Sequence, residues 1–366
     1  MHDMHMDHGA MAMDHCPLAP DSRVTEFVLD WPGALMPEMT MEGACHVAGG
    51  GSTHELVWDR HHEGKVFWVS GQAYDHIARV AMDGSATFFA MDPGSAPHGM
   101  TFDQKGQLWV TFEGHGQLAR IDPDGSIADR IDVCLNAEGA APLNTRPHGL
   151  GLAADGALWF TGKLTNTVGR VDPSGKVTHY ALPMIGAVPI YIAAGPGGTM
   201  WCTELAGNMI ARVDASRAVR EFAIPTPASR PIAVIPAPDG QSMWFTQEAG
   251  GKVARIDPDG AITEFPVPLT DRTAILGGLA FDAEGAMWVQ QYVPAPPAGA
   301  IATANDYIVR IGKDILTASP GDLTSVPVTW FKAPSRGTVM HRITQGPDGN
   351  IWFSELGLNR IGRIVL

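Results

Sequence analysis

A tryptophan recurs seven times along the chain, at intervals of 41, 50, 42, 43, 44 and 64 residues. Each lies in a short apolar phrase, which is clearest at residues 347–355, Pro-Asp-Gly-Asn-Ile-Trp-Phe-Ser-Glu. A period of about 40–50 residues with short apolar strands is typical of a β-propeller that has one blade per repeat. The sequence therefore predicts an all-β, seven-bladed β-propeller in which these residues pack on the second strand of each blade: Trp68, Trp109, Trp159, Trp201, Trp244, Trp288 and Trp352.

Each repeat predicts four antiparallel strands, but the last repeat is one strand short. Its third strand ends directly before Leu366, the last residue of the sequence. Residues 24–28 (VTEFV) match the expected outer strands at 219–223 and 262–266. We therefore expect an N-terminal strand to complete the last blade and close the ring, because closure removes exposed strand edges. The expected organisation is a disordered tail over residues 1–21 and a single propeller over residues 22–366.

Composition narrows the choice of partners. The formal net charge is −14, which disfavours nucleic acid, because phosphate binding needs a basic surface. No apolar stretch has the length of a membrane span. We expect a monomer that acts on a small molecule. The sequence as written has no signal peptide and reads as cytoplasmic, whereas removal of a signal would make the protein periplasmic or secreted.

The four cysteines match no zinc-binding spacing. Cys202 lies in a strand phrase and is expected to be a small buried residue. Cys16, Cys45 and Cys134 fall in irregular segments, which leaves room for one disulfide.

Aligning the repeats on their tryptophans places a histidine at the start of the first strand in four adjacent blades, namely His54, His98, His148 and His341. Ile190, Ile232 and Gly277 take this position in the other three blades. Second strands end on the same face with Glu113, Glu204, Glu248 and Glu355. Imidazoles and carboxylates that converge on one axis indicate a metal site or an acid–base site. The alternative is that the histidines cap turns and bind water.

On the metal-site interpretation, the expected ligands are His54, His98, His148, His341, Glu113 and Glu355. The residues expected to contact substrate are Glu204, Glu248, Tyr191 and Tyr292. Longer connections at 30–53, 134–146 and 293–306 lie at the same end of the blades. Within the last of them, residues 294–299 read either as a lid or as an ordinary surface loop.

The N-terminal tail has an unusual composition. Residues 1–16 contain five methionines and the histidines His2, His5, His8 and His15. Thioether and imidazole ligands together suit copper, so the tail is a candidate metal-binding segment. A compositional accident is the alternative.

Three phrases, at residues 262–265, 346–355 and 359–364, resemble the virginiamycin B lyase (streptogramin lyase) family. The resemblance implies a seven-bladed propeller and a Mg²⁺-dependent β-elimination that linearises cyclic depsipeptide antibiotics, an antibiotic-resistance activity. The family has an active-site histidine and glutamate fourteen residues apart in its last blade, and His341 and Glu355 match them. The resemblance implies that His341 is the catalytic base and that Glu355 holds the metal or orients the imidazole.

One family feature is missing. The family's other active-site histidine lies in the blade before the last, where this chain has Gly277 and Gly278. The leading hypothesis is a metal-dependent carbon–oxygen lyase, with Mg²⁺ as cofactor, acting on an ester or lactone-like small molecule or a cyclic depsipeptide. Two alternatives stay open: an Fe- or Cu-dependent redox or oxygenase metalloprotein that uses the four histidines, and a non-catalytic binding propeller.

Overall fold

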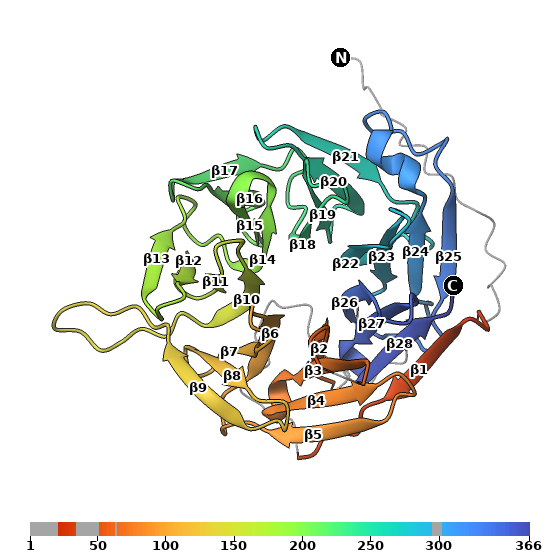
Figure 1. Cartoon of the computed structure of the whole chain (residues 1–366). Helices are drawn as coiled ribbons and strands as arrows, with labels where there is room; N and C mark the ends of the chain where they lie inside the picture. Colours follow the sequence, from red (N-terminus) through yellow and green to blue (C-terminus); the bar gives the residue numbers. More distant parts are fainter. Residues whose placement is uncertain (1–20, 34–50, 63, 295–301) are drawn as a thin grey trace.

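The computed structural model describes residues 21–33, 51–62, 64–294 and 302–366. Seven four-stranded antiparallel sheets stand around a central axis, as the blades of a propeller (Figure 1). This confirms the predicted fold class and the number of blades. In the ranges just given, no helix is long and apolar enough to cross a membrane.

The strands run from the axis outward in chain order within blades one to six. Blades one to three are β2 (Thr53–Trp58), β3 (Val66–Gly71), β4 (His76–Ala81), β5 (Ala86–Ala90); β6 (Pro97–Phe102), β7 (Leu108–Phe112), β8 (Gln117–Ile121), β9 (Ile127–Asp132); and β10 (Pro147–Leu152), β11 (Leu158–Gly162), β12 (Thr167–Val171), β13 (Val177–Ala181). Blades four to six are β14 (Pro189–Gly195), β15 (Thr199–Glu204), β16 (Met209–Val213), β17 (Val219–Ala223); β18 (Pro231–Pro236), β19 (Met243–Gln247), β20 (Lys252–Ile256), β21 (Ile262–Pro266); and β22 (Ile275–Phe281), β23 (Met287–Tyr292), β24 (Tyr307–Ile311), β25 (Val328–Lys332).

Blade seven contains strands from both ends of the sequence: β26 (Met340–Gln345), β27 (Ile351–Glu355), β28 (Arg360–Ile364) and β1 (Val24–Val28). The outer strand β1 pairs antiparallel with β28, with Val24 opposite Ile364. The predicted closure of the ring is therefore confirmed. Short 3₁₀ turns complete the described structure: η2 (Gln72–Tyr74), η3 (Pro196–Gly198), η4 (Lys313–Thr317) and η5 (Leu356–Leu358).

The seven repeated tryptophans all lie on the second strand of their blades and are buried, with at most 7% of their surface exposed. In six blades the indole contacts an aromatic ring on the outermost strand, as in the stacked pair Trp244 and Phe265, whose centroids lie 5.5 Å apart. Such pairs add about 0.5–1.5 kcal/mol each beyond their buried area. The tryptophans are thus structural residues of the blade, as predicted.

Cys134 and Cys202 are buried free thiols. Cys16 and Cys45 lie outside the described residues, as does the His/Met-rich tail with His2, His5, His8 and His15.

Candidate functional site

The inner strand of each blade begins with a β-bulge, and the bulge determines which residues face the axis. In β6, pairing with β7 stops after Pro97 and resumes at Met100, so His98 and Gly99 fall inside the bulge. A bulge bends the strand and re-aims its side chains. The corresponding first bulge positions in blades one, three and seven hold His54, His148 and His341. The register therefore places the four histidines at equivalent positions, as the alignment of the repeats predicts.

The imidazole rings of these histidines cluster at the axis. The ring centroids of His54, His98 and His341 lie 5.0, 5.2 and 5.3 Å from one another, and His148 stacks on His98 at 3.6 Å. Gly99 makes this stacking possible, because a Cβ atom there would lie only 2.3 Å from the carbonyl oxygen of His148. We call these four side chains the histidine ring.

Hydrogen bonds orient two members of the histidine ring. The Nδ1 atom of His54 lies 2.9 Å from the carbonyl oxygen of Ser52, and Nδ1 of His98 lies 3.2 Å from that of His148. Because a carbonyl oxygen only accepts, each Nδ1 must donate its proton, and each Nε2 keeps its lone pair. Nε2 of His98 is buried and has no hydrogen-bond partner. His98 therefore presents an unprotonated nitrogen that has no partner among the described residues.

Burial also keeps two members of the histidine ring, His98 and His148, uncharged. Burial and the neighbouring His148 imidazole hold the pKa of His98 well below its usual range. Burial and the Lys163 ammonium lower the pKa of His148 as well. Both imidazoles are consequently neutral at neutral pH, because burial disfavours their protonated forms.

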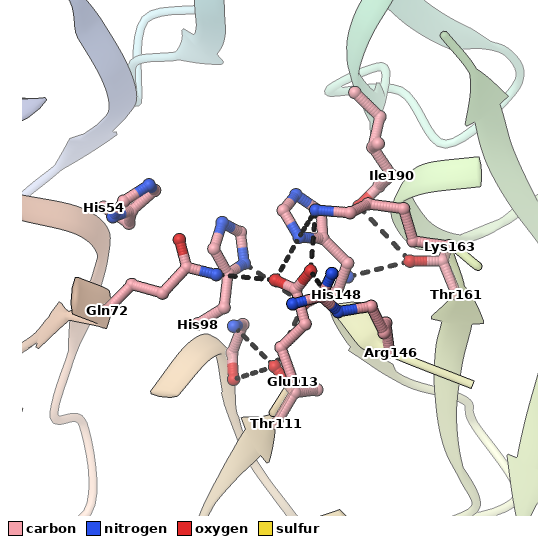
Figure 2. A network of polar contacts seen from close by, with 12 residues as sticks. His54, Gln72, His98, Thr111, Glu113, Arg146, His148, Thr161, Lys163 and Ile190 are labelled. Carbon is pink, nitrogen blue, oxygen red and sulfur yellow. Dashed lines mark hydrogen bonds and ion pairs between the residues drawn. The ribbon is translucent and has the colours of Figure 1, made fainter. Parts of the chain in front are cut away.

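A polar network around Glu113 borders the histidine ring (Figure 2). The Glu113 carboxylate receives Nζ of Lys163 at 2.7 Å, Nδ1 of His148 at 3.2 Å and the amide of Gln72 at 2.5 Å. Burial alone would raise the pKa of Glu113, but Lys163 and His148 lower it far below its ordinary value. Arg146 lies 3.8 Å away, so two cations face one carboxylate and the network carries a net positive charge.

The four predicted glutamates occupy two different positions. Glu113 and Glu248 come one residue after the last paired residue of the second strand, whereas Glu204 and Glu355 are themselves that residue. Because side chains alternate along a strand, a shift of one residue turns the side chain to the other face. Glu113 and Glu248 thus lie at the axial end of their blades, and Glu204 and Glu355 point into the blade.

Glu355 lies beside Glu26, Arg360 and Asp306 in blade seven and its neighbourhood. Burial and the Glu26 carboxyl raise its pKa well above the usual value. Met340, not His341, is its partner across the ladder, because the bulge adds one residue to β26. Glu204 has a similar setting in blade four, next to Glu221.

The remaining predicted contact residues lie in two separate places. Tyr292 donates its hydroxyl to Glu248 at 3.3 Å, and Nε of Arg230 reaches the same carboxylate at 2.7 Å. Tyr191 instead contacts Arg342, whose guanidinium carbon lies 4.6 Å from the centre of its ring. Of the predicted lid at 294–299, residues 295–299 lie outside the described part of the chain.

The donor groups at the axis bear on Mg²⁺, the metal that the family resemblance implies. Mg²⁺ takes oxygen ligands, but the Glu113 and Glu248 carboxylates are already held by cations and hydrogen-bond donors. Among the described residues, no group of three or more His, Cys, Asp and Glu side chains is arranged to hold a metal ion. The residues that the structure describes do not fit a Mg²⁺ ion, and the reaction steps below are assigned to protein groups alone.

Sequence reasoning missed three members of this site: Gln72, Arg146 and Lys163. Three consecutive blades hold Gln72, Glu113 and Lys163 at the same place. Each directly follows the second-strand residue that pairs with the first residue of the inner strand. The sequence contains a signal for this equivalence, because each of the three residues follows the tryptophan of its blade by four positions.

Comparisons with known proteins agree with this architecture. The sequence model of the virginiamycin B lyase family matches residues 67–311. A streptogramin B lyase structure aligns with a TM-score of 0.71 at 21% identity, covering 93% of this chain and 96% of that one. Virginiamycin B lyase from Staphylococcus aureus aligns with a TM-score of 0.70 at 23% identity, covering 94% and 99%. A catalytically inactive variant of the S. aureus enzyme with quinupristin gives 0.71 at 23%, with the same coverage. The search of curated proteins found no match.

Proposed function

Because the chain belongs to the virginiamycin B lyase family, we propose that it is a carbon–oxygen lyase that opens an ester or lactone by β-elimination at the histidine ring. The observation that carries this proposal is the cluster of imidazoles at the axis, in which the ring of His341 lies 5.2 Å from that of His54 and 5.3 Å from that of His98. Elimination begins with removal of a proton from carbon, and a neutral imidazole is the side chain best suited to accept it.

A histidine Nε2 takes the proton on the carbon next to the substrate carbonyl. The electron pair of that C–H bond forms a carbon–carbon double bond, and the bond between the β-carbon and the ester oxygen breaks. The carboxylate departs as the leaving group, and no water is added to the substrate. By resemblance we assign the base role to His341, whose ring lies 5.2 Å from His54 and 5.3 Å from His98.

The Glu113 network supplies the charge that this step needs. Negative charge develops on the substrate carbonyl oxygen as the proton leaves, and fixed positive charge stabilises it. Lys163 and Arg146 provide two cations against the single carboxylate of Glu113. We propose that these cations orient the substrate carbonyl toward blades two and three, while the base approaches from blade seven.

A mass measurement tests the reaction type. The purified protein is incubated with a streptogramin B-type cyclic depsipeptide and with simple β-acyloxy carbonyl compounds. Elimination opens a cyclic substrate without a change in mass and creates a conjugated double bond, whereas hydrolysis adds one water. A product that carries one water, or no product from any compound, contradicts the proposal.

A histidine variant tests the assigned base. His341→Ala should lower the rate of elimination by about 10²- to 10⁴-fold, which is the usual contribution of a general base. His179→Gln, on the outer strand β13, is the matched control and should leave the rate unchanged. Circular dichroism checks that both variants fold. An unchanged rate in folded His341→Ala removes this residue from the mechanism.

A further inference from the structure

The second position of the inner-strand bulges forms a layer across the axis. In six blades this residue is Glu55, Gly99, Gly149, Ala233, Gly278 or Arg342. The bulge of blade four is one residue shorter, so Tyr191, which directly follows it and pairs with Thr203, takes the corresponding place. Three are large and four are small. Nε of Arg342 lies 2.7 Å from the Glu55 carboxylate, and its guanidinium covers the Tyr191 ring of blade four. We call Glu55, Tyr191 and Arg342 the axial layer.

A cavity of about 600 Å³ lies beyond the axial layer, on the side away from the histidine ring. All seven inner strands or the turns after them contribute to its wall, which is mainly apolar. Its aromatic members are Trp58, Phe102, Tyr191 and Phe281. This volume lies in the range of ordinary small-molecule sites, which combine apolar walls with a few convergent polar groups. The mechanism proposed above does not use this cavity.

The charged groups of the cavity are predominantly basic. Arg342 forms part of the wall, and Arg60 lines it while its guanidinium covers Trp58 at 5.0 Å. The lining carboxylate of Asp103 is already engaged by Nε1 of Trp109 at 3.1 Å and by two backbone amides. A ligand in this cavity therefore meets arginine as its main charged partner.

The counter-ion of Arg342 is poorly suited to remain charged. The Glu55 side chain is only 8% exposed, and burial raises the pKa of its carboxyl despite the nearby Arg342. An incoming carboxylate that stays partly hydrated can replace it as the partner of the guanidinium. Arginine is well adapted to this exchange, because its planar fork binds carboxylates in a bidentate manner and stacks on aromatic rings.

From this combination we propose that the cavity is a second ligand site, which binds a small amphipathic carboxylate with a flat apolar body. The apolar body packs among the aromatic side chains, and the carboxylate pairs with Arg342. This site is distinct from the histidine ring, since the axial layer lies between them.

Isothermal titration calorimetry with 2-naphthoate tests the proposal, with 2-naphthamide as the uncharged analogue. We expect one site per chain and an affinity for the amide at least tenfold weaker, as loss of a charge-assisted pair predicts. Arg342→Met should weaken 2-naphthoate binding at least tenfold. Glu55→Gln should strengthen it, because it removes the competing carboxylate. Because the two variants should change the affinity for 2-naphthoate in opposite directions, they distinguish a ligand contact from general disruption of the axis.

Arg363→Met is the matched control, because Arg363 also stacks on aromatic rings but in blade seven, over Phe27 and Trp352. Its affinity for 2-naphthoate should equal that of the wild type. Absence of saturable binding to the wild type, equal affinity for the amide, or weaker binding to Glu55→Gln would overturn the proposal. If Arg342→Met fails to fold, the strengthening by Glu55→Gln still decides.

Discussion

Replacing Glu204 with glutamine is expected to remove a large part of the pH dependence of stability between pH 6 and pH 8. Glu204 is fully buried at the end of β15 and lies against Glu221 of the outer strand β17. In blades five and seven a cation stands at the facing position of the third strand, Lys252 or Arg360. In blade four that position is Met209. In the part of the chain that the structure describes, these two carboxyl groups thus meet without a cation opposite Glu204 in the ladder.

Burial is the main cause, and the Glu221 charge the second, of a pKa of Glu204 that is raised from 4.5 to about 9. The native state therefore keeps a proton that the unfolded chain loses above pH 4.5. The stability contributed by this proton is fully present below pH 4.5 and is lost as the pH rises through 9. Between pH 4.5 and pH 9, each unit of rising pH lowers the free energy of unfolding by roughly 1.4 kcal/mol. Roughly 2.7 kcal/mol is therefore lost from pH 6 to pH 8.

Urea unfolding at pH 6, 7 and 8 measures this difference. The free energy of unfolding of Glu204→Gln should decline less than that of the wild type, by roughly 2–3 kcal/mol over the range. The amide fits this environment, because blade five already has Gln247 at the same place. Met209→Lys, which recreates the arrangement of blade five, should also flatten the profile. Glu284→Gln, at a side chain 81% exposed, is the control. Parallel profiles for the wild type and Glu204→Gln would refute the reasoning.

Two further outcomes follow from the polar network and from the closure of the ring. Lys163→Met leaves the buried Glu113 carboxylate without its ammonium partner and should lower the free energy of unfolding by about 3–5 kcal/mol. The double variant Lys163→Met/Glu113→Gln should recover much of this loss. A loss below about 1 kcal/mol in Lys163→Met alone contradicts the ion-pair account. Deleting residues 1–28 removes β1 and exposes the edge of β28, so we expect aggregation in light scattering. Deleting residues 1–20 keeps β1 and should remain monodisperse; equal behaviour of the two deletions would show that closure is dispensable.

The repeat made the scaffold predictable. Seven tryptophans, with four of their six intervals between 41 and 44 residues, predicted the number of blades. The match of residues 24–28 to two outer strands was enough to predict closure. The equivalence of the four histidines followed from the same alignment, because it depends only on counting residues within a repeat. These features are periodic, and sequence reasoning handles them well.

Non-periodic features were harder to predict. Glu355 was expected on the same face as His341, but the bulge in β26 shifts the ladder and pairs Glu355 with Met340. A shift of one residue turns a strand side chain to the opposite face. The contact of Arg342 with Tyr191 joins blades seven and four across the axis, and nothing local in the sequence indicates it.

The placement of β1 in blade seven also affects how the chain is made. Val24 pairs with Ile364, so β1 has no β28 to pair with until almost the whole sequence has been synthesised. Closing so long a loop is a late step in folding, because distant contacts bring their benefit only after the intervening chain is ordered. During that interval β1 is a potential template for wrong pairing. Glu26 at its centre, later buried against Arg360, makes mispairing costly, since an unmatched charge must be buried in any other sheet.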